Sequence, residues 1–94
     1  MKTNGKTQAL EIGRFIVADP KICHGQLTYK GTRIMVWQIL EALGEGESVD
    51  ELVKAWGGRV SREAILETIR LCRNALLDSR GKLRTTPIKL PLAA

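Results

Sequence analysis

Residues 36–65, VWQILEALGEGESVDELVKAWGGRVSREAI, contain three helical patterns separated by glycines. Apolar residues recur at helical spacing over 36–43, and the glycines that follow end this first helix. Ser48 and Glu51 form a capping box that opens the second helix, which a glycine pair ends. Ser61 then caps a third helix. The stretch therefore predicts three helices joined by tight turns.

The third helix is predicted to be the longest and to end near Asp78. At 100° per residue, its core line is Ile65, Ile69, Cys72 and Leu76. The opposite face then holds Glu63, Glu67, Arg70, Asn74 and Asp78. Three acids and one base on that face would repel a DNA duplex, which argues against reading of the major groove by the middle of this helix.

Two short apolar stretches precede the helices. Residues 15–18 and 27–30 each predict a strand, and proline at position 20 ends the first. Together they predict a β-hairpin. The predicted fold is mainly α: a three-helix core in the order of a helix-turn-helix domain, which is also the order of any small helical bundle, with a short N-terminal β-hairpin.

The charge is unevenly distributed over the 94 residues, which carry a formal net charge of +5. Residues 1–14 sum to +2 and predict a flexible basic arm. Residues 15–78 sum to −1 and form the predicted domain, while residues 79–94 sum to +4 and form a basic and apolar tail. The cationic character therefore lies at the two ends, where it favours phosphates or an acidic protein partner.

The residue types exclude several functions. Two cysteines do not make a disulfide framework, and with one histidine they do not supply a zinc site, so we expect no metal and no cofactor. No leader and no membrane-length apolar run is visible, which predicts a cytoplasmic protein without membrane contact. No catalytic constellation appears. We therefore expect a binding protein and not an enzyme.

Three motifs in order carry a family resemblance. DPKICHG at 19–25, GTRIMV at 31–36 and GESVDEL at 46–52 resemble the family called domain of unknown function 433. Two positions depart from its pattern: His24 stands for a usual glycine and Met35 for a usual proline. The GTRI motif reads either as a turn that aims the first helix or as a binding loop.

The resemblance implies a dimeric helix-turn-helix protein of the homeodomain or winged-helix kind. In several cases the family is similar to VapB-type antitoxins that are encoded beside toxins with a PIN-like nuclease domain. It implies an antitoxin-like protein that neutralises such a nuclease and binds its own promoter DNA. The alternative is a standalone DNA-binding transcriptional regulator without a toxin partner.

Three sets of residues are candidate contacts. For DNA, the basic start of the third helix offers Arg59, Ser61 and Arg62, although a solvated helix start is the alternative. For the toxin, the tail offers Arg80, Lys82, Arg84, Ile88, Leu90 and Leu92 as an added strand with a basic linker; the alternative is a mobile terminus. For a homodimer, the third helix is apolar around most of its circumference, which points to Leu71, and Trp37 lies off the inner line of the first helix. The alternative is that Leu71 is simply exposed.

Overall fold

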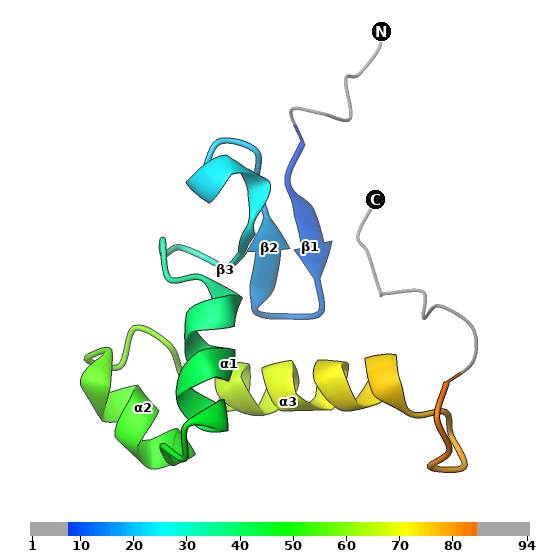
Figure 1. Cartoon of the computed structure of the whole chain (residues 1–94). Helices are drawn as coiled ribbons and strands as arrows, with labels where there is room; N and C mark the ends of the chain where they lie inside the picture. The colour runs from blue at the N-terminus through cyan, green and yellow to red at the C-terminus, as the bar shows by residue number, and fades with distance from the viewer. Residues whose placement is uncertain (1–7, 85–94) are drawn as a thin grey trace, which may run out of the picture.

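The computed structural model describes residues 8–84. Three short strands come first and three helices follow (Figure 1). In chain order the elements are β1 (Leu10–Ile12), β2 (Ile16–Ala18), the 3-10 turn η2 (Cys23–Gly25), β3 (Leu27–Tyr29), α1 (Val36–Gly44), α2 (Val49–Ala55) and α3 (Arg62–Leu76).

The strands form one antiparallel sheet in the order β1-β2-β3, and this corrects the predicted fold class. β2 and β3 lie inside the two predicted strands, but β1 was not predicted at all. It lies in the 1–14 range, where Leu10 pairs with Ala18 and Ile12 with Ile16. The fold is therefore a three-stranded sheet followed by three helices, and not a helical core with a hairpin. Three residues are too few to give a strand its alternating signal.

A carboxylate on α3 holds the β1–β2 turn in place. Glu67 accepts hydrogen bonds from the backbone amides of Arg14, at 2.8 Å, and Phe15, at 2.9 Å. Gly13 sits beside it with a φ of +67°, and a Cβ there would lie 2.8 Å from the Glu67 side chain. The turn therefore needs glycine for its backbone conformation and for the space that the carboxylate takes.

α2 and α3 begin directly after the cap residues that the sequence predicted. The Ser48 side chain accepts from the Glu51 amide at 3.1 Å, and Glu51 accepts from the Ser48 amide at 2.8 Å. Ser61 accepts from the Ala64 amide at 3.1 Å. α3 stops at Leu76 rather than at the predicted Asp78, because the chain there turns into a short hairpin.

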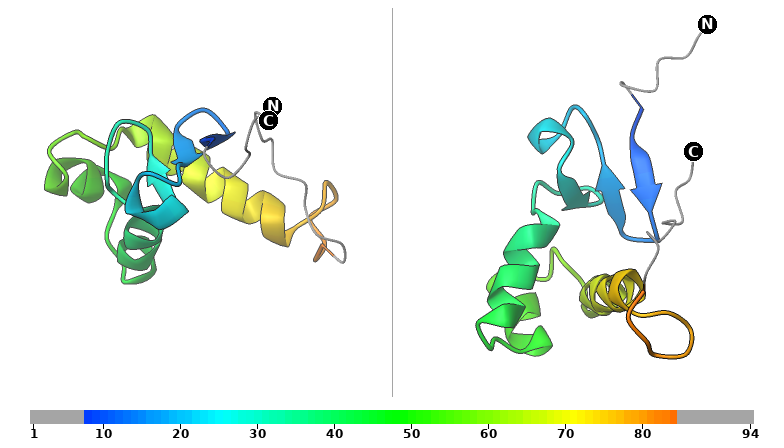
Figure 2. Two further views of the ribbon diagram at one scale, coloured as in Figure 1. Left: turned by 90° about the horizontal axis from the view of Figure 1, so that it is seen from above. Right: turned by 45° about the vertical axis from the view of Figure 1, so that its right-hand side comes forward.

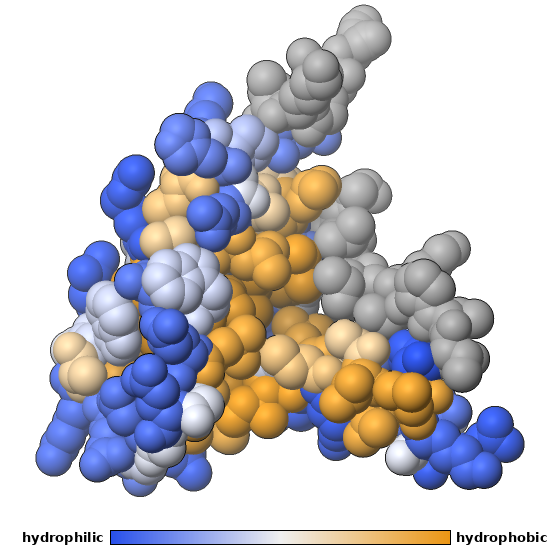
Figure 3. All heavy atoms as spheres, viewed as in Figure 1, coloured by the Kyte–Doolittle hydropathy of each residue, from blue (hydrophilic) through white to orange (hydrophobic). Residues whose placement is uncertain are grey.

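The sheet stands over the junction of α1 with α3, while α2 packs against both helices on the side away from the sheet (Figures 1 and 2). α3 passes beneath the β1–β2 turn and continues beyond it. In Figure 1 and in the left view of Figure 2 its last turns project from the body of the protein. A continuous apolar surface runs from below the sheet along this projecting part (Figure 3).

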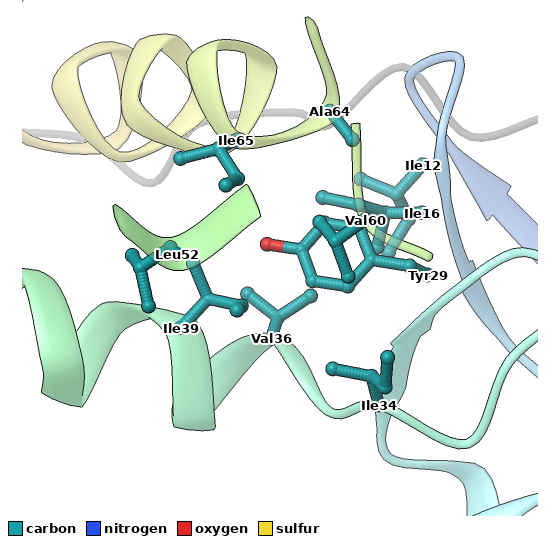
Figure 4. Close-up of a cluster of buried hydrophobic side chains, with 10 residues drawn as sticks. All are labelled: Ile12, Ile16, Tyr29, Ile34, Val36, Ile39, Leu52, Val60, Ala64 and Ile65. Carbon is teal, nitrogen blue, oxygen red and sulfur yellow. The ribbon is translucent and has the colours of Figure 1, made fainter. Parts of the chain in front are cut away.

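The core gathers at this junction (Figure 4). Each strand and each helix contributes to it, and so do two of the connecting segments. The buried side chains are Ile12, Ile16, Tyr29, Ile34, Val36, Ile39, Leu52, Val60, Ala64 and Ile65. From α3, only residues of its first two turns belong to this cluster. The sheet and the first half of α3 are therefore one packed unit.

Tyr29 ties the sheet to α3 through a buried hydroxyl pair. Its oxygen lies 2.8 Å from Oγ1 of Thr68, which in turn donates to the Ala64 carbonyl at 2.8 Å. Because Thr68 has one hydroxyl proton, Tyr29 is the donor in the first bond. Burial raises the pKa of the Tyr29 phenol above its ordinary value of about 10.

This raised pKa predicts a loss of stability in alkali. The unfolded chain ionises its tyrosine first, so the free energy of unfolding should fall as the pH rises from about 10 through the folded pKa. Tyr29 is the only tyrosine, so tyrosinate absorbance follows this one residue. Tyr29→Phe is the control, and urea titrations should show a shallower alkaline slope for it. Equal slopes for both proteins would contradict the assignment.

The η2 turn holds two non-glycine residues in the left-handed region. Cys23 has a φ of 50° and His24 a φ of 59°. His24 is exposed. We expect His24→Gly to raise the free energy of unfolding by about 0.5–1 kcal/mol, because glycine adopts this conformation without strain. The urea midpoint measures it, and His24→Ala, which keeps the strain, should show no gain.

Candidate functional site

The start of α3 carries the three predicted DNA contacts, and the structure gives them different surroundings. Ser61 is the helix cap, so its hydroxyl oxygen is already engaged by the Ala64 amide. Arg62 forms an exposed ion pair with Asp50 of α2, with 2.6 Å between Nη1 and Oδ1. Arg59 is exposed and lines a hollow together with Ser61. The structure therefore brings Arg59 and Ser61 to one hollow, whereas Arg62 is not part of its lining.

The hollow beside Arg59 is cationic. It measures about 150 Å³, and its wall includes Arg14, Lys30 and Arg59 from three separate segments of the chain. Lys30 pairs with Glu11 at 3.1 Å, and the Arg14 guanidinium lies 4.9 Å from the centre of the Phe15 ring. Sequence reasoning missed Arg14 and Lys30, because only the folding of the β1–β2 turn against α3 brings them to Arg59.

The outer face of α3 differs from its prediction. The buried residues are Ala64, Ile65 and Thr68, while Ile69, Cys72 and Leu76 of the predicted core line are exposed. The buried face is thus turned by about a fifth of a circle from the predicted one. Glu67 faces the β1–β2 turn, and Asp78 lies beyond the helix end.

Solvent therefore meets a different set of charges on this helix. Arg62, Arg70 and Arg73 are exposed with Glu63 as the exposed acid between them. The predicted acidic outer face is wrong, and with it the electrostatic argument against a DNA duplex along this helix.

Residues 77–84, which we call the hook, follow α3 as a tight hairpin. Leu77 and Leu83 form an antiparallel bridge, and the Arg84 amide donates to the Leu76 carbonyl at 2.8 Å. Asp78 Oδ1 accepts from the amides of Arg80, at 2.9 Å, and Lys82, at 3.0 Å. These amides hold the pKa of the Asp78 carboxyl below its ordinary value. Arg80 and Lys82 themselves are exposed.

The hook encloses a polar hollow of about 410 Å³ with the end of α3. Arg73 and Arg84 both line it, and Arg84 Nε donates to the Asn74 carbonyl at 2.7 Å. The structure thus brings the predicted partner residues Arg80, Lys82 and Arg84 together on one hairpin. The remaining predicted tail contacts, Ile88, Leu90 and Leu92, lie outside the described residues.

An apolar face runs from α1 to the hook. Trp37 is 49% exposed, Leu76 58% and Leu83 67%. Two hollows mark this face: a shallow one of about 220 Å³ beside Trp37, and one of about 160 Å³ between the sheet, α1 and α3. Leu27, Val36 and Leu40 line both. Figure 3 shows the surface as continuous.

The two predicted dimer contacts both lie on this face, at different depths. Trp37 borders the shallow hollow, whereas Leu71 is half-buried in the wall of the hollow under the sheet. Trp37 and Leu71 therefore lie on the same surface, but they do not form a single contact.

Metal-ligating side chains do not gather within residues 8–84, where no three of His, Cys, Asp or Glu are placed to hold an ion. Cys72 is exposed on α3 and Cys23 lies in η2, and both are free thiols. No helix in the same part of the chain is both long and apolar enough to cross a membrane.

Comparison with known families finds a match over residues 16–72, from β2 into α3, to the family described as protein of unknown function (DUF433). This is more than half of the chain. The chain belongs to the DUF433 family. No curated protein and no solved structure matches it.

The GTRI motif lies within the matched residues, and the structure shows its setting. Gly31 adopts a φ of 77° at the turn after β3. The Thr32 hydroxyl donates to the Tyr29 carbonyl at 2.8 Å and accepts from the Ile34 amide at 2.9 Å. The motif therefore sets the path from β3 into α1, while Arg33 is exposed at its tip. β1, the end of α3 and the hook lie outside the matched residues.

Proposed function

We propose that this DUF433 protein is a binding protein without catalytic activity, an antitoxin-like partner that neutralises a PIN-like nuclease. One observation carries the proposal: an open apolar face and a basic hook adjoin at the projecting end of α3. Large exposed apolar patches on a small chain mark surfaces that bind protein. Such a role would place the protein in the cytoplasm.

The hook supplies charge of the right sign for this partner. Its Arg80 and Lys82 are exposed, and the Asp78 carboxylate is engaged by their backbone amides. A metal-dependent nuclease concentrates carboxylates in its active site, so a cationic hairpin flanked by leucines is complementary to it. The nuclease class itself rests on the family resemblance.

Co-expression tests the proposal. A PIN-like nuclease encoded beside this chain should stop growth alone and lose its toxicity when this chain is present. Arg80→Glu with Lys82→Glu should abolish the protection, because the charge reverses while the backbone amides still hold the hook on Asp78. Lys54→Glu, an exposed lysine on α2, is the matched control. A nuclease that is equally toxic with and without this chain would contradict the proposal.

We also propose that the protein is a homodimer through the surface around Trp37. A half-exposed tryptophan beside Leu27 and Leu40 is typical of an interface anchor. Light scattering after size exclusion should give twice the chain mass, and Trp37→Glu should give a monomer. Trp37→Phe, which keeps an aromatic ring, should stay dimeric. A monomer in the unaltered protein would end this proposal.

The second candidate function is a DNA-binding regulator, and the exposed arginines of α3 favour it. Arg70 and Arg73 lie on the solvent face, with the cationic hollow of Arg14, Lys30 and Arg59 at the start of the same helix. Gel-shift titrations across salt concentrations should show a slope that flattens by about 0.9 for each lost phosphate contact. Arg70→Ala with Arg73→Ala should flatten it, and Lys54→Ala should not. Unchanged slopes in the double variant would exclude this surface.

A further inference from the structure

The hollow beside the start of α3 collects positive charge from three distant segments. Arg14 comes from the β1–β2 turn, Lys30 directly follows β3, and Arg59 lies in the connection between α2 and α3. Of the described residues that line this hollow, none is an aspartate or a glutamate. The fold therefore presents three cations, and no acid, to one space.

The neighbouring acids are engaged in ways that leave this charge available. Glu67 of α3 accepts from the amides of Arg14 and Phe15, at 2.8 and 2.9 Å, and so holds in place the backbone that carries Arg14. Glu11 pairs with Lys30 at 3.1 Å, but both side chains are exposed, and an exposed ion pair is weak enough to exchange for another anion. Within residues 8–84, Arg14 and Arg59 form no ion pair.

The uncharged lining adds no competing polar group. Tyr29, Val60 and Ala64 are buried, and the Tyr29 hydroxyl bonds to Thr68. The Ser61 hydroxyl oxygen accepts from the Ala64 amide as the helix cap. Because such a floor screens charge less than water does, the cations at its edge act more strongly on an anion. An occupant would therefore be held by the three cationic side chains.

The size and charge of the hollow favour one kind of anion. Its volume of about 150 Å³ is below the roughly 300–1,000 Å³ of pockets that enclose a whole ligand, so it suits a single group. A phosphate monoester has three free oxygens and a charge of about −1.5 to −2 at pH 7. A carboxylate or a phosphodiester has two free oxygens and a single charge. Three cations that approach from three segments match the monoester best, and the arginine fork binds phosphate oxygens in pairs.

We propose that this hollow binds a terminal phosphate group, with Arg14 and Arg59 as its main ligands and Lys30 as the third. The rest of the ligand would extend into solvent. Such a group is carried by small phosphate esters and by the 5′ end of a nucleic acid. The site does not depend on a nuclease partner or on a duplex that lies along α3.

Equilibrium dialysis of the full chain with inorganic phosphate tests the proposal. Binding should be saturable, and Arg14→Ala and Arg59→Ala should each weaken it by at least about tenfold, because each removes a charge-assisted fork. Both side chains are exposed, so the fold should persist, which circular dichroism checks. Lys54→Ala, an exposed lysine on α2 outside the hollow, is the matched control and should bind as the parent does. Arg59→Lys, which keeps the charge without the fork, should lie between the parent and Arg59→Ala.

Three results would overturn the proposal. The first is the absence of saturable binding. The second is equal affinity in Arg14→Ala, Arg59→Ala and Lys54→Ala, which would mean that only the overall charge attracts phosphate. The third is displacement of phosphate by acetate, at matched ionic strength, as readily as by unlabelled phosphate, which would mean that the hollow does not select a phosphate group.

Competition separates the two sources of the group. Glycerol phosphate is compared with two short single-stranded oligonucleotides of one sequence, one with a 5′-phosphate and one with a 5′-hydroxyl. Displacement by glycerol phosphate as effective as that by the phosphorylated strand would support a small ester. A phosphorylated strand at least about tenfold more effective than both other competitors would support a nucleic-acid end. Equal displacement by the two strands would overturn the proposal, because the backbone and not the terminal group would then be bound.

Gel shifts with a duplex that carries 5′-hydroxyl ends keep this site apart from the DNA-binding candidate. The absence of a shift would count against DNA binding along α3, while saturable phosphate binding that needs Arg14 and Arg59 would still support the hollow as a phosphate site.

Discussion

Ile39→Ala is expected to lower the free energy of unfolding by about 3–4 kcal/mol, the largest effect of any single change proposed for this protein. Ile39 of α1 is 0% exposed and belongs to the core cluster at the junction of the sheet and helices. Alanine removes apolar contacts and leaves a cavity that surrounding strands and helices cannot fully close. In a domain of this size such a loss is a large part of the total stability.

Leu40→Ala is the matched control, since it removes a similar side chain from the next position of the same helix. Leu40 is 37% exposed, so its replacement should cost clearly less, about 1 kcal/mol. Urea unfolding followed by circular dichroism measures both. Equal losses at the two positions would mean that the junction is not the core of the fold.

Glu67→Ala is expected to cost about 2–3 kcal/mol, because it removes two hydrogen bonds to a charged acceptor at once. The amides of Arg14 and Phe15 would lose their partner, and that of Phe15 is partly buried. Glu67→Gln should cost less than alanine but more than nothing. Its amide oxygen can accept from one donor, while its NH₂ group faces the other.

The matched control for Glu67 is Glu63→Ala, an exposed acid one turn earlier on α3. It should leave the urea midpoint almost unchanged. Hydrogen exchange adds a local readout: the amides of Arg14 and Phe15 should exchange faster in Glu67→Ala and not in Glu63→Ala. Unchanged exchange at both amides would rule out the carboxylate as the anchor of the turn.

Local signals in the sequence predicted the helices well. The Ser48 and Ser61 caps stand where expected, and α1 ends at the predicted glycines. Caps depend on residues within one turn, so a single sequence contains all that is needed. The family match over 16–72 confirms the resemblance read from the three motifs.

Features that depend on long-range contacts were not predictable in the same way. The α3 pattern permits two apolar lines, and only the packed sheet decides that Ala64, Ile65 and Thr68 are buried while Ile69 and Leu76 are not. Thr68 carries a hydroxyl, so no apolar signal in the sequence indicated its burial. Its hydroxyl is buried against that of Tyr29, 39 residues away in the chain. Likewise, Glu67 looked like a solvent-facing acid until the β1–β2 turn was in place.

In α3, the residues that stabilise the fold are separate from those that are exposed for binding. Most small domains must use the same residues for both purposes. Its first two turns pack into the core, and its last turns carry the exposed Leu76, Arg70 and Arg73 and lead into the hook. Under the proposed function, substitutions in the last turns would change what the surface recognises while the folding free energy of the body stays nearly constant. Across generations, such a chain would then follow a diverging partner by drifting at one end of one helix, without compensating changes in the core.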